Sequence, residues 1–454
     1  MKSVRYSLIY KFFVAQIKFG YYKTGDCLPS IEDLTKIYHA SSRTVHSAYT
    51  QLQQDGYISL SAGRKTKVVY QITEAECIRN CRTYYLARRD AIFALKETLQ
   101  ILFTPLMREG CRRLGPPEMR HIKEMAAKLG RGDFYVSFFC GRAMFLTLKN
   151  RFALYLFNDV VSFYQFPHTL LRRWGATVDK QRLQALSESL VAACDRQDRE
   201  ELFRVYMEIQ DLMNQILCLY IPYAEKFISV PEQIPFEWKV YRDHPQRCYS
   251  VAAQMINQIL IEQEYRPGDT LPFYGELAEA YHASFSTIRR TMDLLEKLGV
   301  VATSRGVGTK VTEISQDPSR LQYGIVQGIL KTFREVMQIL CISFDAIVER
   351  ADLQTEKIDA CAIRLHRLDD AEGPVAFLTC MRYLLHGQTG FQGIGDKLYE
   401  VLLLGLPLLE VQTISSMVQP LAHSLEAGDT SAFYAVLKEL VLQIAQTADG
   451  LAAP

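Results

Sequence analysis

An internal repeat is the feature that most constrains this chain. The tetrapeptide Tyr-His-Ala-Ser occurs at residues 38–41 and again at residues 281–284, an offset of 243 positions. When this offset is held from residue 6 to residue 68, no gap is needed and 20 of the 63 positions are identical. A repeat of this kind indicates two copies of one folded unit. The 454-residue chain is therefore expected to be internally duplicated, in the order A–B–A′–B′.

Each copy carries the local signals of three helices. A first helix is expected to run to about residue 19 or residue 264, and a Gly-Asp turn and a Leu-Pro pair then lead into a short helix. Proline is favoured at a helix start, so this helix is expected to begin near Pro29 or Pro272. A serine after the next turn can cap a third helix, and a glycine in left-handed conformation can end it. The third helices are therefore expected at 42–54, between Ser41 and Gly56, and at 285–297, between Ser284 and Gly299.

Two short β-prone runs follow each third helix and flank a glycine. They lie at 57–60 and 67–70 in the first copy and at 300–303 and 310–312 in the second. Helix, helix, turn, helix and a two-stranded ribbon are the elements of a winged helix-turn-helix.

These motifs resemble those of the GntR family of bacterial transcription regulators. The shared pattern is G-D-x-L-P-S, a helix, S-x-x-T-V, L-x-x-D-G and a G-x-x-T-x-V wing, over about 65 residues in each half. The first copy is more similar to the short branch of the family. The second keeps the wing residues Gly306, Gly308 and Thr309, whereas Lys65 replaces the second glycine in the first copy. The resemblance implies a DNA-binding repressor or activator, and two such domains in one chain resemble a dimer fused into one polypeptide.

Helix-type spacing with few β signals continues through residues 75–230 and 315–454. These regions resemble the all-helical FCD effector domain, most clearly in the helices that follow residues 194–198 and 425–429. The predicted fold is mainly α. Two winged helix-turn-helix domains, at 1–72 and 244–314, each with a small two-stranded β wing, alternate with two helical effector or oligomerisation domains, at 73–243 and 315–454.

A DNA reader needs base-contacting side chains on a helix in the major groove and cations for the phosphates. Residues 1–70 hold ten basic and four acidic residues, whereas residues 244–313 hold seven and eight. The first copy is therefore expected to dominate phosphate affinity. The candidate DNA-binding residues are Ser41, Ser42, Arg43, Thr44, His46, Arg64, Lys65, Lys67, Ser286, Thr287, Arg289, Arg290, Arg305 and Lys310.

The arginines that the family places on its reading elements are mostly absent. The first copy has Glu32, Ser42 and His46 at those positions, and the second has Gly275, Phe285 and Arg289, of which Arg289 alone matches. The operator is therefore expected to differ from the family's usual one, with two half-sites that need not be identical. The alternative function is a scaffold that does not bind DNA and keeps the winged-helix fold for oligomerisation.

The helical regions suggest an effector and no metal. Metal-binding FCD domains begin their ligand set with Asp-x-x-x-His, which is absent here; Ser137 and Gly141 stand at the matching places. The aromatic residues between 138 and 164 are expected to be core, and the alternative is an apolar pocket in which Arg142 and Lys149 bind the carboxylate of a small-molecule effector. His366, His386 and His423 lack helical ligand spacing. No metal or cofactor is expected.

Enzyme and membrane functions are not expected. The sequence has no phosphate-binding glycine loop and no nucleophile elbow. It has no apolar run near the ~20 residues that span a bilayer. The net charge is +2, and the 11 cysteines are odd in number, which favours a reduced, cytoplasmic protein. The expected partners are a double-stranded DNA operator and an effector, bound by a pseudo-dimer within one chain or by a homodimer.

Overall fold

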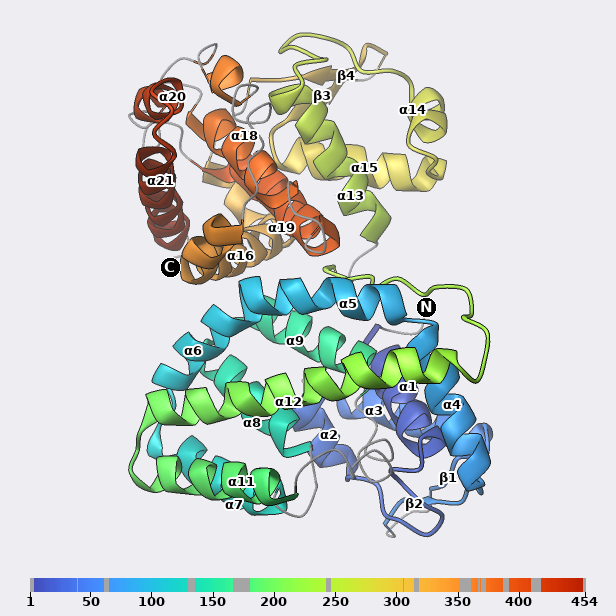
Figure 1. The fold of residues 1–454 in the computed structure, drawn as a ribbon. Coiled ribbons are helices and arrows are strands. Elements are labelled where there is room, and N and C mark those ends of the chain that lie inside the picture. The colour runs from blue at the N-terminus through green and yellow to red at the C-terminus, as the bar shows by residue number, and fades with distance from the viewer. Residues whose placement is uncertain are drawn as a thin grey trace. The chain divides into compact units, whose positions relative to one another are not determined.

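The computed structural model describes residues 4–38, 40–60, 65–129, 135–165, 180–241, 246–304, 306–313, 318–350, 361–365, 368, 373–386, 392–409 and 418–451. The chain forms two compact units (Figure 1). Unit 1 comprises Met1–Ala94, Leu106–Lys149 and Leu154–Glu237. Unit 2 comprises Leu95–Pro105, Asn150–Ala153 and Trp238–Pro454. Both units are mainly helical, and each contains one two-stranded sheet.

Each unit contains a three-helix module with a small antiparallel sheet. The first module (residues 4–70) is built of α1 (Val4–Lys18), α2 (Ile31–Tyr38), α3 (Ser42–Gln54), β1 (Ile58–Ser59) and β2 (Lys67–Val68). The second module (residues 246–312) is built of α13 (Gln246–Ile256), the π-helical turn η2 (Asn257–Ile261), α14 (Tyr274–Ala280), α15 (Phe285–Lys297), β3 (Val301–Ser304) and β4 (Gly308–Val311). The predicted order of elements is confirmed, and the third helices have the predicted bounds.

Three helix boundaries differ by a few residues from the sequence expectation. The short helices begin at Ile31 and Tyr274, two residues after Pro29 and Pro272, so each proline lies before its helix instead of at the first helical position. At α14 the residue before the helix is Phe273, whose backbone N–H donates to the Glu276 carboxylate at 2.9 Å. The first helix of the second module ends at Ile261, through the π-helical turn η2, instead of continuing to residue 264.

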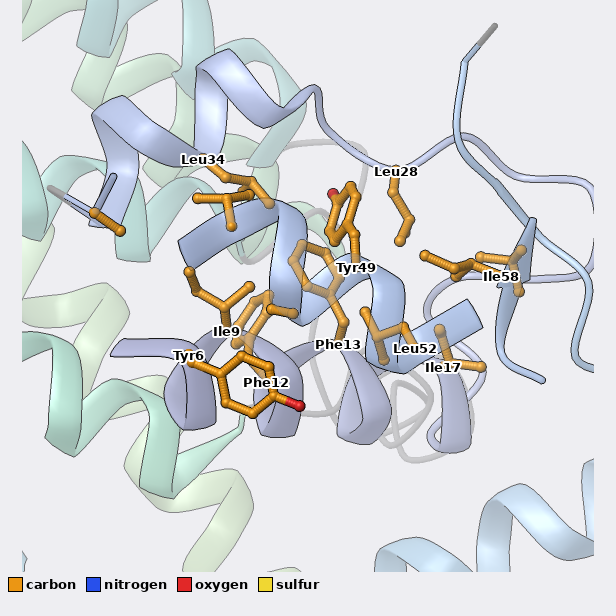
Figure 2. Close-up of a cluster of buried hydrophobic side chains, with 14 residues drawn as sticks. Tyr6, Ile9, Phe12, Phe13, Ile17, Leu28, Leu34, Tyr49, Leu52 and Ile58 are labelled. Atoms are coloured by element: carbon orange, nitrogen blue, oxygen red, sulfur yellow. The ribbon is translucent and has the colours of Figure 1, made fainter. Parts of the chain in front are cut away.

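The core of the first module forms where α1 lies against α3 (Figure 2). Phe13 of α1 packs edge-on against Tyr49 of α3, with ring centroids 5.7 Å apart. Ile9 and Leu52 are fully buried in the same cluster. Fully burying such a side chain contributes about 1.5–3 kcal/mol. This apolar contact fixes the orientation of α3 within its module.

The remaining elements of unit 1 are helices, with a loop segment after the last of them. They are α4 (Glu74–Leu86), α5 (Arg89–Thr98), α6 (Thr104–Arg112), α7 (Pro116–Leu129), α8 (Tyr135–Thr147), α9 (Arg151–Tyr164), α11 (Lys180–Asp195) and α12 (Arg199–Glu225). The larger parts of α5, α6 and α9 belong to unit 1, and the end of α5 and the starts of α6 and α9 belong to unit 2. α12 packs against α4, α8 and α11. A buried 2.8 Å hydrogen bond from the Gln16 amide to the Gln165 side-chain oxygen ties α1 to the end of α9. The first module is thus joined to the helices of its own unit.

Unit 2 packs its helices around α16 (Gly324–Arg350), which contacts η1, α18, α19 and α21. The further elements of this unit are η1, a π-helical turn (Leu99–Phe103), η3, a 3-10 turn (Pro318–Gln322), α18 (Gly373–His386), α19 (Gln392–Gly405), η5, a 3-10 turn (Leu406–Leu408), α20 (Val418–Glu426) and α21 (Thr430–Gly450). α13 of the second module packs on α15 and α19. In the parts of the chain that the structure describes, no helix combines the length and apolarity needed to cross a membrane.

The segment between α12 and α13 has neither helix nor strand over residues 226–241. Within unit 1, the Ile234 N–H donates a 2.6 Å hydrogen bond to the Ala87 carbonyl, and the Gln233 side chain donates to the Leu86 carbonyl at 2.7 Å. The boundary between the units falls between Glu237 and Trp238.

Candidate nucleic-acid interface

A serine caps the third helix of each module in the same way. Ser41 has φ −68° and ψ 150°, and Ser284 has φ −72° and ψ 152°. The hydroxyl of each accepts a hydrogen bond from the backbone N–H three residues later, at 3.2 Å in both helices. The cap satisfies a donor that the helix itself leaves unpaired. It thereby defines where α3 and α15 begin, and which side chains lie on their first turn.

The first turns expose most of the candidate reading residues. Ser42, Arg43 and His46 are exposed on α3, and Ser286, Arg289 and Arg290 are exposed on α15. Thr44 and Thr287 are half-buried, and their hydroxyls lie 2.9 Å and 2.8 Å from the hydroxyl of the capping serine. The Ser286 hydroxyl also lies 3.0 Å from that of Ser284. The capping serines therefore lie within hydrogen-bond distance of the two threonines and Ser286, whereas the arginines stay exposed.

The arginines on these helices differ from Lys297 of α15, whose ammonium lies 2.8 Å from the Asp293 carboxylate. Arg43, Arg289 and Arg290 form no salt bridge with any residue in the described part of the chain. An exposed guanidinium keeps five donors in a planar fork that matches phosphate oxygens and the O6 and N7 acceptors of guanine. These three side chains are therefore chemically available for DNA.

The sheet of each module is fixed by the turn that precedes its second helix. In the first module the Gly25 N–H donates to the Val68 carbonyl at 2.8 Å, and in the second the Gly268 N–H donates to the Val311 carbonyl at 2.9 Å. Lys65, Lys67 and Lys310 are exposed on these wings. Arg64 and Arg305 lie outside the described residues.

Three exposed apolar side chains of the second module are not among the DNA-binding residues predicted from the sequence. Phe273 is 79 % exposed, Phe285 59 % and Val307 58 %. Phe285 lies on the first turn of α15, directly beside Ser286. The available sequence signal was the position of Phe285 opposite Ser42, and of Phe273 opposite Ser30, at the repeat offset.

The two candidate effector residues have different environments. Arg142 is buried in α8, whereas Lys149 is exposed beyond the end of that helix, in left-handed conformation with φ 54°. The nearby aromatic rings are packed together, with Phe145 and Phe157 stacked at 4.7 Å. A side chain at Gly141 would overlap the Tyr206 hydroxyl. The binding of an effector by Arg142 and Lys149 stays a prediction.

Within the described residues, no group of three His, Cys, Asp or Glu side chains is arranged to hold a metal ion. The His386 ring nitrogen Nδ1 lies 2.7 Å from an Asp396 carboxylate oxygen, and His423 is exposed on α20. His366 lies outside the described residues.

Three helices with a capped, exposed third helix and a two-stranded sheet define a protein of the helix-turn-helix class. The model of the bacterial regulatory proteins of the gntR family matches residues 248–311, which form nearly all of the second module. The chain is 32 % identical over 108 residues to the uncharacterized HTH-type transcriptional regulator YhcF of Bacillus subtilis, an overlap of 24 % of this chain and 89 % of that protein. The chain belongs to the GntR family.

Other relatives are similar to smaller parts of this chain. The HTH-type transcriptional repressor YtrA of Bacillus subtilis is 28 % identical over 94 residues, 21 % of this chain and 68 % of the relative. The Uxu operon transcriptional regulator of Escherichia coli is 34 % identical over 70 residues, 15 % of this chain, and the chain spans only 27 % of that relative. The solved structure of E. coli McbR/YncC superposes with a TM-score of 0.26 at 16 % identity, over 47 % of this chain and 98 % of that one. A score this low establishes no common overall arrangement.

GntR-family members are transcription regulators that bind DNA operators. Membership of the family confirms the expectation of a regulatory protein rather than an enzyme.

Proposed function

We propose that this chain is a transcription regulator that carries two winged helix-turn-helix DNA readers, one in each half, produced by an internal duplication. The observation that carries the proposal is the pair of serine-capped helices, α3 and α15. They begin at residues 42 and 285, which are separated by the repeat offset of 243. Both helices have exposed side chains on their first turns.

The proposed duplication is supported by equivalent hydrogen bonds. Ile58 is paired with Val68 across the first sheet, and Val301 is paired with Val311 across the second. Isolated bridges join Cys27 to Lys67 and Thr270 to Lys310. Each partner in the second module is the residue 243 positions after its counterpart. Side-chain identity at 20 of 63 positions is thus accompanied by the same backbone pairing.

The helical regions support the same proposal by a second correspondence. α12 is capped by Asp198, whose carboxylate accepts from the Glu201 N–H at 3.0 Å. α21 is capped by Asp429, whose carboxylate accepts from the Ala432 N–H at 2.9 Å. A residue with positive φ precedes each aspartate, Gln197 at 56° and Gly428 at 66°. We therefore assign residues 73–243 and 315–454 to two related FCD-like domains, which separate and follow the readers at 1–72 and 244–314.

The proposed readers differ in net charge, which predicts that they contribute differently to DNA affinity. The first has six more basic than acidic residues over residues 1–70, whereas the second has one more acidic than basic residue over residues 244–313. Phosphate affinity grows with the number of cations that displace counterions from DNA. The first reader therefore supplies most of the sequence-independent affinity, and the second contributes mainly through its exposed α15.

The helical domains are proposed to carry regulation, by binding a small-molecule effector. Arg142 is the stronger of the two candidate residues, because it is buried whereas Lys149 is exposed, and a buried guanidinium suits a carboxylate ligand. The alternative of a scaffold that does not bind DNA is not favoured, because α3 and α15 keep exposed arginines that form no ion pair with a described residue.

Selection from a randomised pool of DNA duplexes, followed by electrophoretic mobility shift of the selected sequence, tests the proposal. The full chain is expected to enrich one sequence and to bind it more tightly than a shuffled duplex of equal composition. A matched control replaces Lys438, which pairs with Asp345 on the helical domain at 2.7 Å, by alanine, and should bind as the wild type does. Equal affinity for selected and shuffled duplexes would favour the scaffold.

A further inference from the structure

The second module presents aromatic side chains where the first module presents serines. Phe285 is the first residue of α15, where α3 has Ser42, and Phe273 precedes α14, where α2 is preceded by Ser30. We propose that Phe273 and Phe285 read thymine methyl groups in the major groove, so that apolar contact specifies the second half-site. This inference rests on the proposed function, because it requires the second module to enter the groove.

The ring of Phe285 packs against a neighbouring ring of the second module. Its centroid lies 5.8 Å from that of Tyr274, with the ring planes at 54°. Phe285 nevertheless remains 59 % exposed, and Phe273, the neighbour of Tyr274 in sequence, is 79 % exposed. A ring that already packs on a neighbour but stays more than half exposed loses less conformational freedom on binding than a ring without such a contact, so its burial can contribute to affinity.

The position of these rings favours DNA as the occupant of this surface. In helix-turn-helix proteins the N-terminal residues of the third helix meet the base edges. Phe285 lies on that turn, and Arg289 and Arg290 lie one turn further along α15, exposed and without an ion pair to a described residue. The family model of DNA-binding regulators matches residues 248–311, which contain all of these side chains. An exposed apolar side chain close in sequence to exposed arginines suits DNA, where the edge of a base lies between phosphates.

The chemistry of phenylalanine selects the base. Its ring lacks a conventional hydrogen-bond donor or acceptor, so it discriminates through apolar groups. Among the four bases, thymine alone places a methyl group on the major-groove edge. The hydroxyls of Ser30 and Ser42 in the first module can instead bond to donors and acceptors of several bases. The two half-sites are therefore read by different chemistry.

The test removes single methyl groups from the DNA. Full-length protein is titrated against the duplex selected from the randomised pool, with each thymine in turn replaced by uracil, and binding is followed by fluorescence anisotropy. Loss of one contacted methyl group should weaken wild-type binding about fourfold, the transfer free energy of a CH₂-sized group. Phe285→Ser and Phe273→Ser should each abolish the effect at one position, and Phe285→Leu should retain it.

Two further variants test whether the effect can be transferred to the first module and whether it is specific to these two positions. Ser42→Phe should create new sensitivity to uracil in the first half-site. Leu442→Ser, which replaces a 44 % exposed apolar residue of α21, should keep the wild-type pattern.

Three outcomes would overturn the inference. Sequence-selective binding without any effect of uracil overturns it and leaves the proposed function intact. Selection of no sequence at all overturns both. Loss of self-association in Phe285→Ser, measured by light scattering, with uracil sensitivity unchanged, assigns the aromatic surface to a protein interface instead.

Discussion

The hydroxyl of Tyr49 donates a 2.7 Å hydrogen bond to the carbonyl oxygen of Pro29. It links the middle of α3 to the segment just before α2, in the first module. The Tyr49 ring is fully buried against Phe13, whereas Pro29 is half-buried at the edge of the core. The relative orientation of α2 and α3 depends on it.

We therefore expect Tyr49→Phe to lower the free energy of unfolding by about 0.5–1.5 kcal/mol, since the half-buried Pro29 carbonyl loses this hydrogen bond. Urea unfolding monitored by circular dichroism measures the change. The control is Tyr57→Phe, on the half-buried rim of the same core, where the described residues provide no hydrogen-bond partner for the hydroxyl. Equal midpoints for all three proteins would show that the Pro29 bond contributes nothing.

The second prediction compares the two readers. Arg43→Ala should weaken DNA binding by about 1–3 kcal/mol if the guanidinium contacts a base, and by less if it contacts a phosphate. Loss of a phosphate contact should also reduce the slope of log K against log salt by about 1. Arg289→Ala should have the smaller effect, because its module adds no net positive charge.

Fluorescence anisotropy titrations at several salt concentrations distinguish a lost base contact from a lost phosphate contact. A larger loss for Arg289→Ala than for Arg43→Ala would show that the charge asymmetry does not decide which reader dominates.

Local backbone chemistry explains why the modules were predictable from sequence. Ser41 and Gly56 each act within a few residues, one as a helix cap and the other at φ 77°, and neither depends on distant packing. The bounds 42–54 follow from these two residues alone. The Gly306–Thr309 wing was instead predicted from the resemblance to the GntR family, and both of its glycines have positive φ, 75° and 106°.

Features that depend on long-range contacts were not predictable. The π-helical turn at Leu99–Phe103 has an ordinary apolar sequence, and its assignment to unit 2 follows from packing on α16, which begins more than 200 residues later. The exposure of Phe273 and Phe285 likewise depends on which neighbours cover them. The repeat offset places Phe285 opposite Ser42 and Phe273 opposite Ser30, but it gives no information on how much of each ring the neighbouring side chains leave exposed.

The third prediction concerns the cysteines. Burial raises the pKa of the Cys140 and Cys111 thiols to about 12 and that of Cys194 to about 11. The thiolate is the reactive form, so at pH 8 a thiol with a pKa near 12 is ionised in roughly one molecule in ten thousand. Raising the pH should therefore speed alkylation of these thiols, whereas Cys27, which is exposed, should react first at pH 8.

Timed alkylation with iodoacetamide, read by peptide mass spectrometry, measures the order of reaction, and Cys27→Ser serves as the control. Rapid labelling of Cys140 in the folded protein would contradict its burial and favour a redox role for the helical domain.

The fourth prediction is that the helical domains act without metal. The sequence lacks Asp-x-x-x-His, and the described residues bring together no three metal-binding side chains. Protein purified without added metal should contain no stoichiometric zinc, nickel or manganese by elemental analysis, and EDTA should leave its melting temperature and its DNA affinity unchanged. A bound ion with three protein ligands would contradict this expectation.

The last prediction concerns the symmetry of the operator. Helix-turn-helix regulators commonly dimerise so that two identical third helices meet two half-sites about one helical turn apart, and a palindromic operator mirrors the two-fold axis. This chain carries two proposed readers on one polypeptide, with Ser42, Arg43 and His46 on α3 but Phe285, Ser286 and Arg289 on α15. Covalent linkage raises the effective concentration of the second reader once the first has bound. One chain should therefore bind one asymmetric operator.

Light scattering of the complex with the selected duplex measures the number of chains bound. One chain on an asymmetric site is the expected result, and inverting the sequence of one half-site should weaken binding. Two chains on a perfect palindrome, with affinity unchanged by Arg289→Ala, would instead show an ordinary homodimer that reads DNA through its first modules alone. The two stoichiometries differ by a full 52.0 kDa chain, so the measurement separates them directly.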